Sequence, residues 1–410
     1  MKDKTRNLVI LIPSLFGGGA EKIISLLIPF FRDRFNVEIV TMERDIDYIF
    51  PEGVEYCSLT PLNALSNRFL KFFLFPLALL KFVRIIKKMR SGTIVFSLLF
   101  RADLLNFFGS LFVQYKKITS IRTNLSNDFR NEKNLLKRYI YPIFARFIYK
   151  NFNKIIAISK GVKLDIIKNL KVKNRNISVI YNPINLKEIR RLKKAPLGRF
   201  EVIFKKPVVL NIGRLEFPKG QWYLVRSFKQ VVNVYPDAVL FIIGKGRLKG
   251  YLKRLISDLG LQNNIFIIGF QKNPYKFMSR ANLYVSTSLW EGFGNTILEA
   301  MACGLPIIST DCKSGPREIL APGSDIKCET SVPERTRYGI LIPNFQKRFL
   351  PSSYPLTNSE RILSDIIIEQ LYRRLNKGEK KGLMNRARDF SIEGIANKYL
   401  EIIETINLRN

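Results

Sequence analysis

The sequence predicts an α/β protein built from two doubly wound parallel sheets, and two observations favour this fold class. First, short apolar, β-branched runs alternate with helical patterns through the 410 residues. This pattern is typical of parallel strands that are covered by helices on both faces. Second, the alternation comes in two series of about 190 residues, each the size of a domain. Ligands of such sheets bind at the carboxyl ends of the strands, so two facing sheets predict a cleft between domains.

The first series opens with Leu8–Ile12, a short apolar run that leads into a glycine loop. This run could pass for a signal peptide, but Pro13 and Ser14 interrupt it and no clear cleavage site follows, so a first buried strand is favoured. Further strands are expected at Val37–Thr41, Ile94–Ser97, Ile118–Ile121, Ile155–Ile158 and Ile177–Ile180. Helices are expected at Ala20–Phe31, Arg68–Met89, Leu135–Asn151 and Gly161–Leu170.

The basic segment Asn182–Pro207 lacks a strand pattern and contains Pro183, Pro196 and Gly198, so we expect the domain junction there. In the second series, strands are expected at Val208–Gly213, Val239–Ile243, Ile265–Gly269, Leu283–Ser286, Pro306–Thr310 and Gly339–Ile342. Helices are expected at Trp222–Val234, Gly246–Leu259, Tyr275–Arg280, Asn295–Ala302 and Glu360–Leu375.

The composition excludes several classes of enzyme. The chain contains no His and only 4 Cys, and no two of these Cys form a CxxC pair. Ser-His-Asp hydrolases, His-ligated zinc enzymes and disulfide scaffolds are therefore excluded. The DxD sequence Asp45-Ile46-Asp47 is typical of a divalent-metal site in some sugar transferases. It has no helper ligands nearby, so a surface loop is favoured, and we expect neither a metal nor a cofactor.

The net charge of +35 is unevenly distributed. Residues 51–200 contain 30 basic and 7 acidic side chains and so account for +23 of the total. Such an excess indicates an anionic partner, which could be nucleic acid, an anionic membrane surface or a phosphorylated substrate. A Lys-rich bias of the source genome is the alternative, but it does not explain why the excess peaks in one third of the chain.

Two apolar segments lie within this basic region. The run Phe72–Leu80 spans about 14 Å as a helix, half of a bilayer core of about 30 Å, so it is too short to cross a membrane. Basic residues flank the run within Arg68–Arg90, and Leu135–Phe152 has the same aromatic and basic character. Both segments suit helices lying in a membrane interface. Ordinary core helices with solvated ends are the alternative.

Three further sequences are candidates for ligand binding. The loop Gly17–Gly19 follows a strand and opens a helix, where backbone N–H groups suit a phosphate or a sugar hydroxyl. Arg214 and Lys219 follow another strand, and two cations in that place can neutralise a diphosphate. Glu291 and Glu299 stand eight residues apart across a glycine turn, and each could bind sugar hydroxyls. The structural alternatives are a tight turn for the glycine loop, solvated charge for Arg214 and Lys219, and helix capping for Glu291 and Glu299.

Taken together, these segments resemble the retaining glycosyltransferases of the GT-B fold, in particular the large family 4 (group 1) of bacterial sugar transferases. The matching segments occur in family order over nearly the whole chain: IPSLFGGGAEK (12–22), AISKGV (157–162), VIYNPI (179–184), NIGRLEFPKG (211–220), FIIGKG (241–246), EGFGNTILEAMACGLPIIST (291–310) and GPREIL (315–320). The loop GGGAEK together with SGPREIL is similar to the subgroup that builds lipid-linked glycans of O-antigen, capsule or N-glycan type.

The resemblance implies two Rossmann-like domains that face a central cleft. Residues 1–190 would form an acceptor-binding, membrane-facing domain, and residues 200–390 would bind the nucleotide sugar. Residues 391–410 would form a helix that returns to the N-terminal domain. The implied reaction moves an N-acetylhexosamine or hexose, with UDP as the expected nucleotide, to a polyprenyl-diphosphate-linked or other lipid-linked glycan.

Site residues also follow from the resemblance. Arg214 and Lys219 would bind the donor diphosphate and act in catalysis together with Glu291, which would contact the donor sugar near its reacting carbon. Glu299 would hold the ribose. The full set of implied donor-binding residues is Gly18, Gly19, Arg214, Lys219, Gly269, Phe270, Glu291, Phe293, Gly294, Asn295, Thr296 and Glu299.

The chain departs from the family pattern in one respect. Many members have a His in the N-terminal domain that contacts the donor sugar, and this chain has none. The corresponding stretch is Ser97–Asn106 or Arg122–Asn124. We expect polar contacts on the acceptor side from residues of these two stretches, namely Arg101, Asp103, Arg122 or Asn124.

The expected partners are a nucleotide-sugar donor, a lipid-linked glycan acceptor and an anionic membrane surface, which would be bound through Arg68–Arg90 and also Leu135–Phe152. The expected location is peripheral, at the cytoplasmic face of the inner membrane. Nucleic acid is not expected, since no nucleic-acid motif appears and the aromatic residues lie in strongly apolar runs. A sugar-nucleotide epimerase or a glycan phosphorylase of the same fold is an alternative, and a nucleic-acid-binding protein is a more remote one.

Overall fold

The computed structural model describes residues 6–46, 50–132 and 134–406. The chain forms two compact units, the first from Met1–Pro183 with Ile392–Asn410 and the second from Ile184–Ser391. The chain passes from one unit to the other at Pro183–Ile184 and again at Ser391–Ile392. The first unit is therefore discontinuous in sequence.

Unit 1 contains a seven-stranded parallel sheet in the order β3-β2-β1-β4-β5-β6-β7. Its strands are β1 (Asn7–Ile12), β2 (Asn36–Thr41), β3 (Glu55–Ser58), β4 (Ile94–Leu98), β5 (Lys116–Ile121), β6 (Lys154–Ala157) and β7 (Ile177–Val179). Its helices are α1 (Gly19–Arg32), α2 (Arg68–Phe73), α3 (Phe75–Lys87), α4 (Phe100–Gly109), α5 (Leu125–Arg130), α6 (Leu135–Lys150), α7 (Lys160–Leu170) and α16 (Ile392–Thr405).

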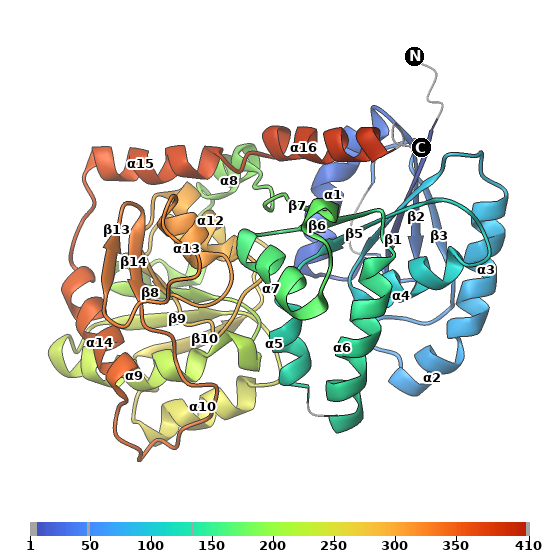
Figure 1. Ribbon diagram of the computed structural model, residues 1–410. Coiled ribbons are helices and arrows are strands. Elements are labelled where there is room, and N and C mark those ends of the chain that lie inside the picture. The colour runs from blue at the N-terminus through green and yellow to red at the C-terminus, as the bar shows by residue number, and fades with distance from the viewer. Residues whose placement is uncertain (1–5, 47–49, 133, 407–410) are drawn as a thin grey trace. The chain divides into compact units, whose positions relative to one another are not determined.

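Alternate residues of the central strands fill two cores on opposite faces of this sheet. Helices α1 and α16 lie side by side on one face of the sheet (Figure 1). There Leu8 and Ile10 pack with residues of both helices, and the rings of Phe31 and Tyr399 lie 6.2 Å apart. On the other face, Val9 packs against buried residues of α3 and α4. The period of two along β1 thus buries all five side chains from Leu8 to Ile12, as the continuous apolar run predicts.

Unit 2 repeats this architecture with the strand order β10-β9-β8-β11-β12-β14-β13. Its strands are β8 (Val208–Ile212), β9 (Val239–Ile243), β10 (Ile265–Gly269), β11 (Leu283–Ser286), β12 (Ile307–Thr310), β13 (Glu334–Thr336) and β14 (Gly339–Ile342). Its helices are α8 (Leu186–Leu192), α9 (Gln221–Val234), α10 (Lys249–Asp258), α11 (Tyr275–Met278), α12 (Asn295–Cys303), α13 (Pro316–Leu320), α14 (Asn358–Gln370) and α15 (Lys377–Arg388).

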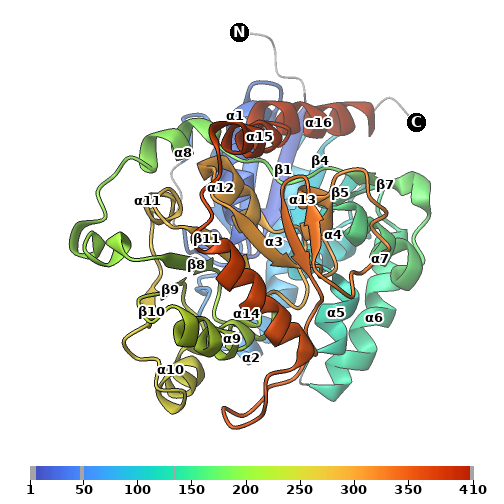
Figure 2. The same ribbon diagram turned by 90° about the vertical axis from the view of Figure 1, so that its left-hand side faces the viewer.

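Only β13 runs antiparallel in unit 2, at the edge next to β14. Figure 2 shows α9, α10 and α14 along one side of the sheet and α11 and α12 along the other. A core that is centred on Trp222 and Phe228 fills the first side. In both units, the strand order reverses next to the first strand, between β1 and β4 and between β8 and β11. Such switch points are where open α/β sheets bind ligands.

The expected helix over Arg68–Met89 is wrong as a single element, because it breaks at Leu74 into α2 and α3. Pro76 lies in the first turn of α3, where its missing N–H costs nothing, and it would interrupt a continuous helix. The sequence shows no periodic pattern in short or polar elements such as β3, β13, α5 and α8, so these elements were not predicted.

Candidate active site

The turn after β8 places two of the expected cations at the carboxyl edge of the unit-2 sheet. A short 3₁₀ turn, Phe217–Lys219, separates β8 from α9, and Gly220 between them has φ +58°. A Cβ at Gly220 would lie 2.4 Å from the Thr287 carbonyl oxygen, so only glycine lets this turn pack against the loop after β11. The Arg214 carbonyl is fixed by the side-chain amide of Gln221 at 3.1 Å.

The next turn packs directly against the first one. A Cβ at Gly244 would lie 1.9 Å from the Gly213 carbonyl oxygen, and one at Gly246 would lie 2.3 Å from that of Leu215. The Leu215 N–H donates to the Lys245 carbonyl at 3.0 Å. These contacts explain the glycines of the sequence GKG (244–246), since the turns after β8 and β9 meet backbone to backbone.

Lys219 and Glu291 lie on opposite sides of the switch point and form an ion pair. Their side chains are 21% and 13% exposed, so the pair is partly withdrawn from water. Ser288 Oγ donates a second hydrogen bond to Glu291 Oε1 at 2.7 Å. The two groups therefore lie close together, as one ligand-binding site requires, and each neutralises the other when no ligand is bound.

Helix α12 begins beside this pair. Its N-cap is Gly294, with φ +103°, which provides no side-chain cap for the first turn of the helix. Backbone N–H groups at Asn295 and the residues after it thus form the positive end of a helix next to Lys219. One turn further, Tyr275 OH donates to Glu299 Oε1 at 3.2 Å, while Tyr284 OH contacts Thr296 Oγ1 at 2.6 Å.

A third turn, after β12, is joined to the Glu291 turn by backbone hydrogen bonds. The Glu291 N–H donates to the Lys313 carbonyl at 2.8 Å, and the Ser314 N–H donates to the Glu291 carbonyl at 3.0 Å. Gly315 has φ +101°, and a Cβ there would lie 1.9 Å from the Phe293 carbonyl oxygen. The position of Glu291 therefore depends on the turn at 313–315.

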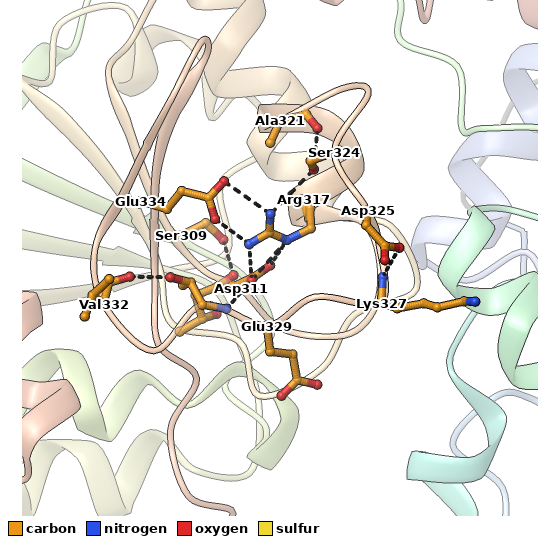
Figure 3. Close-up of polar contacts among 12 residues, drawn as sticks. Ser309, Asp311, Arg317, Ala321, Ser324, Asp325, Lys327, Glu329, Val332 and Glu334 are labelled. Atoms are coloured by element: carbon orange, nitrogen blue, oxygen red, sulfur yellow. Dashed lines mark hydrogen bonds and ion pairs between the residues drawn. The ribbon is translucent and has the colours of Figure 1, made fainter.

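A buried arginine braces that turn (Figure 3). Arg317 on α13 donates to Asp311 at 2.6 and 3.1 Å, and to Glu334 of β13 at 2.6 and 3.2 Å. Burial alone lowers the pKa of this guanidinium, but the hydrogen bonds that it donates to the two carboxylates raise this pKa above its ordinary value. Arg317 lies within the matched segment GPREIL, but sequence reasoning assigned it no role because its two partners lie 6 and 17 residues away.

The expected base-binding region lies at the end of β10. Gly269 has φ +77°, and the β9–β10 register shifts there. The Phe270 ring is 59% exposed, with Lys245 Nζ 5.5 Å from its centroid. An exposed aromatic face beside a cation suits a planar ligand. Phe293, by contrast, is buried against Phe390 at 5.6 Å, so only its backbone is available to a ligand.

In unit 1, the expected glycines lie at the carboxyl end of β1. Gly18 is the N-cap of α1 and Gly19 is the first residue of that helix. A Cβ at Gly18 would lie 2.0 Å from Glu21 Oε2, so the Glu21 carboxylate already occupies the space that a side chain would need. Arg101 lies beyond β4 and donates to Glu43 at 2.6 Å.

Two of the expected acceptor-side residues have internal partners instead. The Asp103 carboxylate is 1% exposed and accepts hydrogen bonds from the hydroxyls of Ser97 (2.7 Å), Thr119 (2.6 Å) and Tyr149 (2.8 Å). Burial raises its pKa to about 6. Buried Asn124 is the N-cap of α5. The polar atoms of both residues hold unit 1 together, and their contact with an acceptor stays a prediction.

Arg122 is half-buried and has partners within unit 1. Its guanidinium donates to Ser120 Oγ at 3.3 Å and to Asn182 Oδ1. Burial lowers its pKa, while nearby Tyr399 and Glu21 raise it. Arg122 therefore joins β5 to the end of the β7 segment.

No group of three or more His, Cys, Asp or Glu suited to a metal ion occurs in residues 6–46, 50–132 and 134–406. In the DxD sequence, Asp45 accepts a hydrogen bond from the Ala64 N–H, and Asp47 lies outside the described residues. Within the same ranges, no helix is both long and apolar enough to span a bilayer.

Comparisons with known proteins show the family of this chain. Residues 17–188 match the family model for Glycosyltransferase Family 4, and residues 199–334 match that for Glycosyl transferases group 1. An uncharacterized glycosyltransferase of Methanocaldococcus jannaschii is 39% identical over 68% of this chain and 70% of its own length.

A second relative is the Campylobacter jejuni N-acetylgalactosamine-N,N'-diacetylbacillosaminyl-diphospho-undecaprenol 4-alpha-N-acetylgalactosaminyltransferase. It is 28% identical over 77% of this chain and 83% of its own length. Among solved structures, Anabaena HepE in complex with UDP and glucose superposes with a TM-score of 0.71 at 19% identity, covering 97% of this chain and 99% of that one. The chain belongs to the group 1, family 4 glycosyltransferases and has the GT-B fold of two Rossmann-like parallel-sheet domains.

Proposed function

We propose that this glycosyltransferase moves an N-acetylhexosamine or hexose from a UDP sugar to a polyprenyl-diphosphate-linked or other lipid-linked glycan, with retention of the anomeric configuration. The observation that carries the donor half is the Lys219–Glu291 pair at the unit-2 switch point, beside the uncapped start of α12. The acceptor half is supported by the C. jejuni relative, whose name specifies a diphospho-undecaprenol substrate.

In the proposed mechanism, the donor diphosphate lies against Arg214, Lys219 and the first N–H groups of α12. Negative charge grows on this diphosphate as the glycosidic bond breaks, and fixed cations and helix amides stabilise it there. Glu291 contacts the sugar, Glu299 the ribose hydroxyls, and the exposed Phe270 ring the base. With retention, the leaving phosphate takes the proton of the acceptor hydroxyl on the same face of the sugar.

Donor binding changes the partner of Lys219. Without a ligand, its ammonium pairs with Glu291. An incoming diphosphate competes for the ammonium and releases the carboxylate to accept hydrogen bonds from sugar hydroxyls. Ser288, which donates to the same carboxylate oxygen, keeps Glu291 in place during this exchange.

The test is a screen of nucleotide-sugar turnover with UDP, GDP and TDP sugars, with and without a lipid-linked acceptor. We expect nucleotide release with UDP sugars, strong stimulation by the acceptor and transfer of the sugar with its anomeric configuration kept. Because protein cations face the diphosphate, we also expect activity in EDTA. Interconversion of donor sugars without transfer would favour the epimerase alternative, and strict dependence on Mg²⁺ or Mn²⁺ would refute the proposed charge stabilisation.

We further propose that unit 1 docks on an anionic membrane through α2, α3 and α6. These three helices contain no acidic residue. Their large exposed apolar side chains are Phe69, Leu70, Phe72, Phe73, Leu77, Leu80, Leu135, Leu136, Tyr139, Ile140, Ile143, Phe144 and Phe147. A soluble surface rarely exposes so many large apolar side chains, and such a surface surrounded by cations suits a membrane interface.

This docking brings the enzyme to an acceptor that cannot leave the bilayer, and it implies a peripheral location at the cytoplasmic face of the inner membrane. Sedimentation with liposomes tests it. Binding should require anionic lipid and weaken, but not vanish, in high salt, because charges are screened while buried rings are not. Replacing Lys81, Arg84, Lys87 and Lys88 by Gln should release the protein, and a variant that still pellets fully would refute the proposal.

A further inference from the structure

Both main-chain polar groups of Glu291 are bound by the turn that follows β12. The Glu291 N–H donates to the Lys313 carbonyl at 2.8 Å, and the Glu291 carbonyl accepts from the Ser314 N–H at 3.0 Å. Gly315 of the same turn packs so closely against Phe293 that a Cβ would lie 1.9 Å from the Phe293 carbonyl oxygen. A shift of this turn would therefore move the main chain of Glu291 with it.

An ion pair closes this turn at its base. Asp311 precedes the turn and Arg317 follows it (Figure 3). The guanidinium donates to the Asp311 carboxylate through Nε, at 3.1 Å from each oxygen, and through Nη2, at 2.6 Å from Oδ2. The two residues are 3% and 7% exposed, so water and salt screen the pair little. This contact holds the two ends of the turn at a fixed separation.

The closed turn is anchored to the sheet at two points. The Asp311 N–H donates to the Ile342 carbonyl of β14 at 2.8 Å. On the other side, Arg317 donates to Glu334 of β13, from Nη2 at 2.6 Å and from Nη1 at 3.2 Å. The planar guanidinium thus binds two carboxylates at once, whereas a lysine ammonium is a point charge without this fork of donors. The sheet edge and the Glu291 turn are connected through one side chain.

We propose that Arg317 is a positioning residue for sugar transfer, which fixes Glu291 through the turn after β12. Lys219 and Ser288 both bind Oε1 and so hold only the end of the Glu291 side chain. In the proposed mechanism the donor diphosphate draws Lys219 away, and the main chain of Glu291 then needs support of its own. The inference rests on the proposed function, since it takes Glu291 as the group that contacts the donor sugar.

A positioning role predicts a loss of turnover rather than of nucleotide affinity. Arg214 and Lys219 lie on the turn after β8, and Phe270 follows β10, so these nucleotide contacts do not depend on the turn that Arg317 closes. A displaced Glu291 affects the sugar instead. A displacement of about 1 Å in a group that meets the reacting atoms can cost about 10²-fold in rate. We therefore expect kcat to fall while the Kd for UDP stays near its native value.

The experiment compares Arg317→Lys with Arg226→Lys in the full chain. Both arginines are buried in unit 2 and bind a carboxylate, but Arg226 of α9 pairs with Glu360 of α14, away from the Glu291 turn. Each substitution keeps the charge and removes the fork of donors, so both variants should fold with a lowered Tm. We expect kcat to fall about 10–100-fold in Arg317→Lys and less than about two-fold in Arg226→Lys, with UDP titration giving a native Kd for both.

A second measurement reports on the turn without any reaction. The chain has 2 Trp, and Trp290 directly precedes Glu291 and is 4% exposed. With Trp222→Phe as the shared background, the fluorescence comes from Trp290 alone. Because Trp290 and Glu291 share a peptide bond, a loosened turn also loosens the packing of this ring. Quenching by acrylamide should increase in Arg317→Lys and stay unchanged in Arg226→Lys.

A purely structural role gives a different result. If kcat falls no further in Arg317→Lys than in Arg226→Lys, measured at the same interval below each Tm, the inference is overturned. A raised Kd for UDP with a native kcat would assign Arg317 to nucleotide binding and would overturn it as well. Should Arg317→Lys fail to fold, Glu334→Gln takes its place, because it loosens the same guanidinium at a partner that is 37% exposed. The loss of kcat should then be smaller and in the same direction.

Failure of the proposed function is distinguishable from failure of this inference. A native protein that transfers no sugar refutes the function, while the quenching of Trp290 still tests whether Arg317 holds the turn. An enzyme that transfers sugar, with native kcat and native quenching in Arg317→Lys, refutes the positioning role and leaves the function standing.

Discussion

The two units have similar sheets, but the segments that follow the carboxyl ends of their strands differ. In unit 2, short glycine turns pack backbone to backbone, and charged side chains form ion pairs such as Lys219–Glu291 and Arg317–Asp311. In unit 1, the edge continues into helices whose apolar side chains are exposed. A small charged ligand needs fixed donors at one point, whereas a membrane needs a broad apolar face. The difference supports the proposal that unit 2 binds the donor and that unit 1 docks on the membrane.

The interiors differ in a similar way. Unit 2 buries Arg226 against Glu360, with Nε 2.6 Å from the carboxylate and both side chains nearly inaccessible. Unit 1 buries Asp103 with three hydroxyl donors, and among the described residues no cation forms an ion pair with it. Burying a charge is costly in both places, but Glu360 has an opposite charge that offsets the cost, whereas Asp103 has only hydroxyl donors.

The largest expected effect is on the stability of unit 2. Arg226→Leu leaves Glu360 buried without its cation and also removes a hydrogen bond to the Tyr354 carbonyl. We expect a loss of about 3–5 kcal/mol in the free energy of unfolding, measured by urea titration. Arg335→Ala, which breaks an exposed pair with Glu369, is the control and should cost less than about 1 kcal/mol. Equal losses would remove this distinction between buried and exposed pairs.

The next effect is catalytic. Lys219→Ala removes a cation that faces the developing charge, so kcat/KM should fall by about 10²–10³-fold, or 2–4 kcal/mol. Lys253→Ala, an exposed lysine on α10, should leave the rate unchanged. Initial rates and thermal melts of both variants decide the matter. A Lys219→Ala enzyme with normal turnover would show that the ion pair is only structural.

A third prediction concerns the pH dependence of unit 1. Burial raises the Asp103 pKa from 3.8 to about 6, so the folded state holds its proton more tightly than the unfolded chain does. This favourable contribution is fully present below about pH 4 and is lost as the pH rises through about 6, a change on the order of 2–3 kcal/mol.

Asp103→Asn removes the titrating group and can still contact the three hydroxyls. The difference in unfolding free energy between the variant and the native protein should therefore change in favour of the variant between pH 4 and 6.5. Urea titrations at several pH values measure it. A constant difference across that range would mean that the cost of burying the ionised Asp103 carboxylate is offset as fully as that of the paired carboxylates of unit 2.

The smallest expected effect on stability belongs to the exposed helices. Phe72→Ser on α2 should change the unfolding free energy by less than about 0.5 kcal/mol, while it lowers binding to anionic vesicles. Phe82→Ala, a fully buried residue on α3, is the contrast and should cost about 3–5 kcal/mol. A large loss of stability from Phe72→Ser would place that ring in a core rather than on a docking surface.

Sequence reasoning succeeded where the pattern is local. Fully buried central strands such as β1 and β9 are continuous apolar runs, and both were predicted within one residue of their observed bounds. The edge strand β13 has the sequence Glu334-Arg335-Thr336 and shows no such run. The break between α2 and α3 was missed because apolar periodicity outweighed the single proline.

The candidate site was predictable for residues on turns after strands, because topology alone brings those turns to one edge. The Lys219–Glu291 contact was not, since the two lie 72 residues apart and meet only across the switch point. Asp103 and Asn124 show a further limit of sequence reasoning. Each is polar and near the start of a helix, but sequence does not reveal whether such a side chain caps the helix, turns inward or contacts a ligand.

The return of α16 to unit 1 has a consequence for how the protein is made. Every strand of unit 1 is complete by Val179, but Ile395, Tyr399 and Ile403, which fill one face of its core, leave the ribosome only after the whole of unit 2. Unit 2, in contrast, is continuous from Ile184 to Ser391. N-terminal domains usually fold first during translation. Here the N-terminal unit is completed after unit 2, and the part of its β1–β4 face that α16 covers stays open to chaperones until that helix has been made.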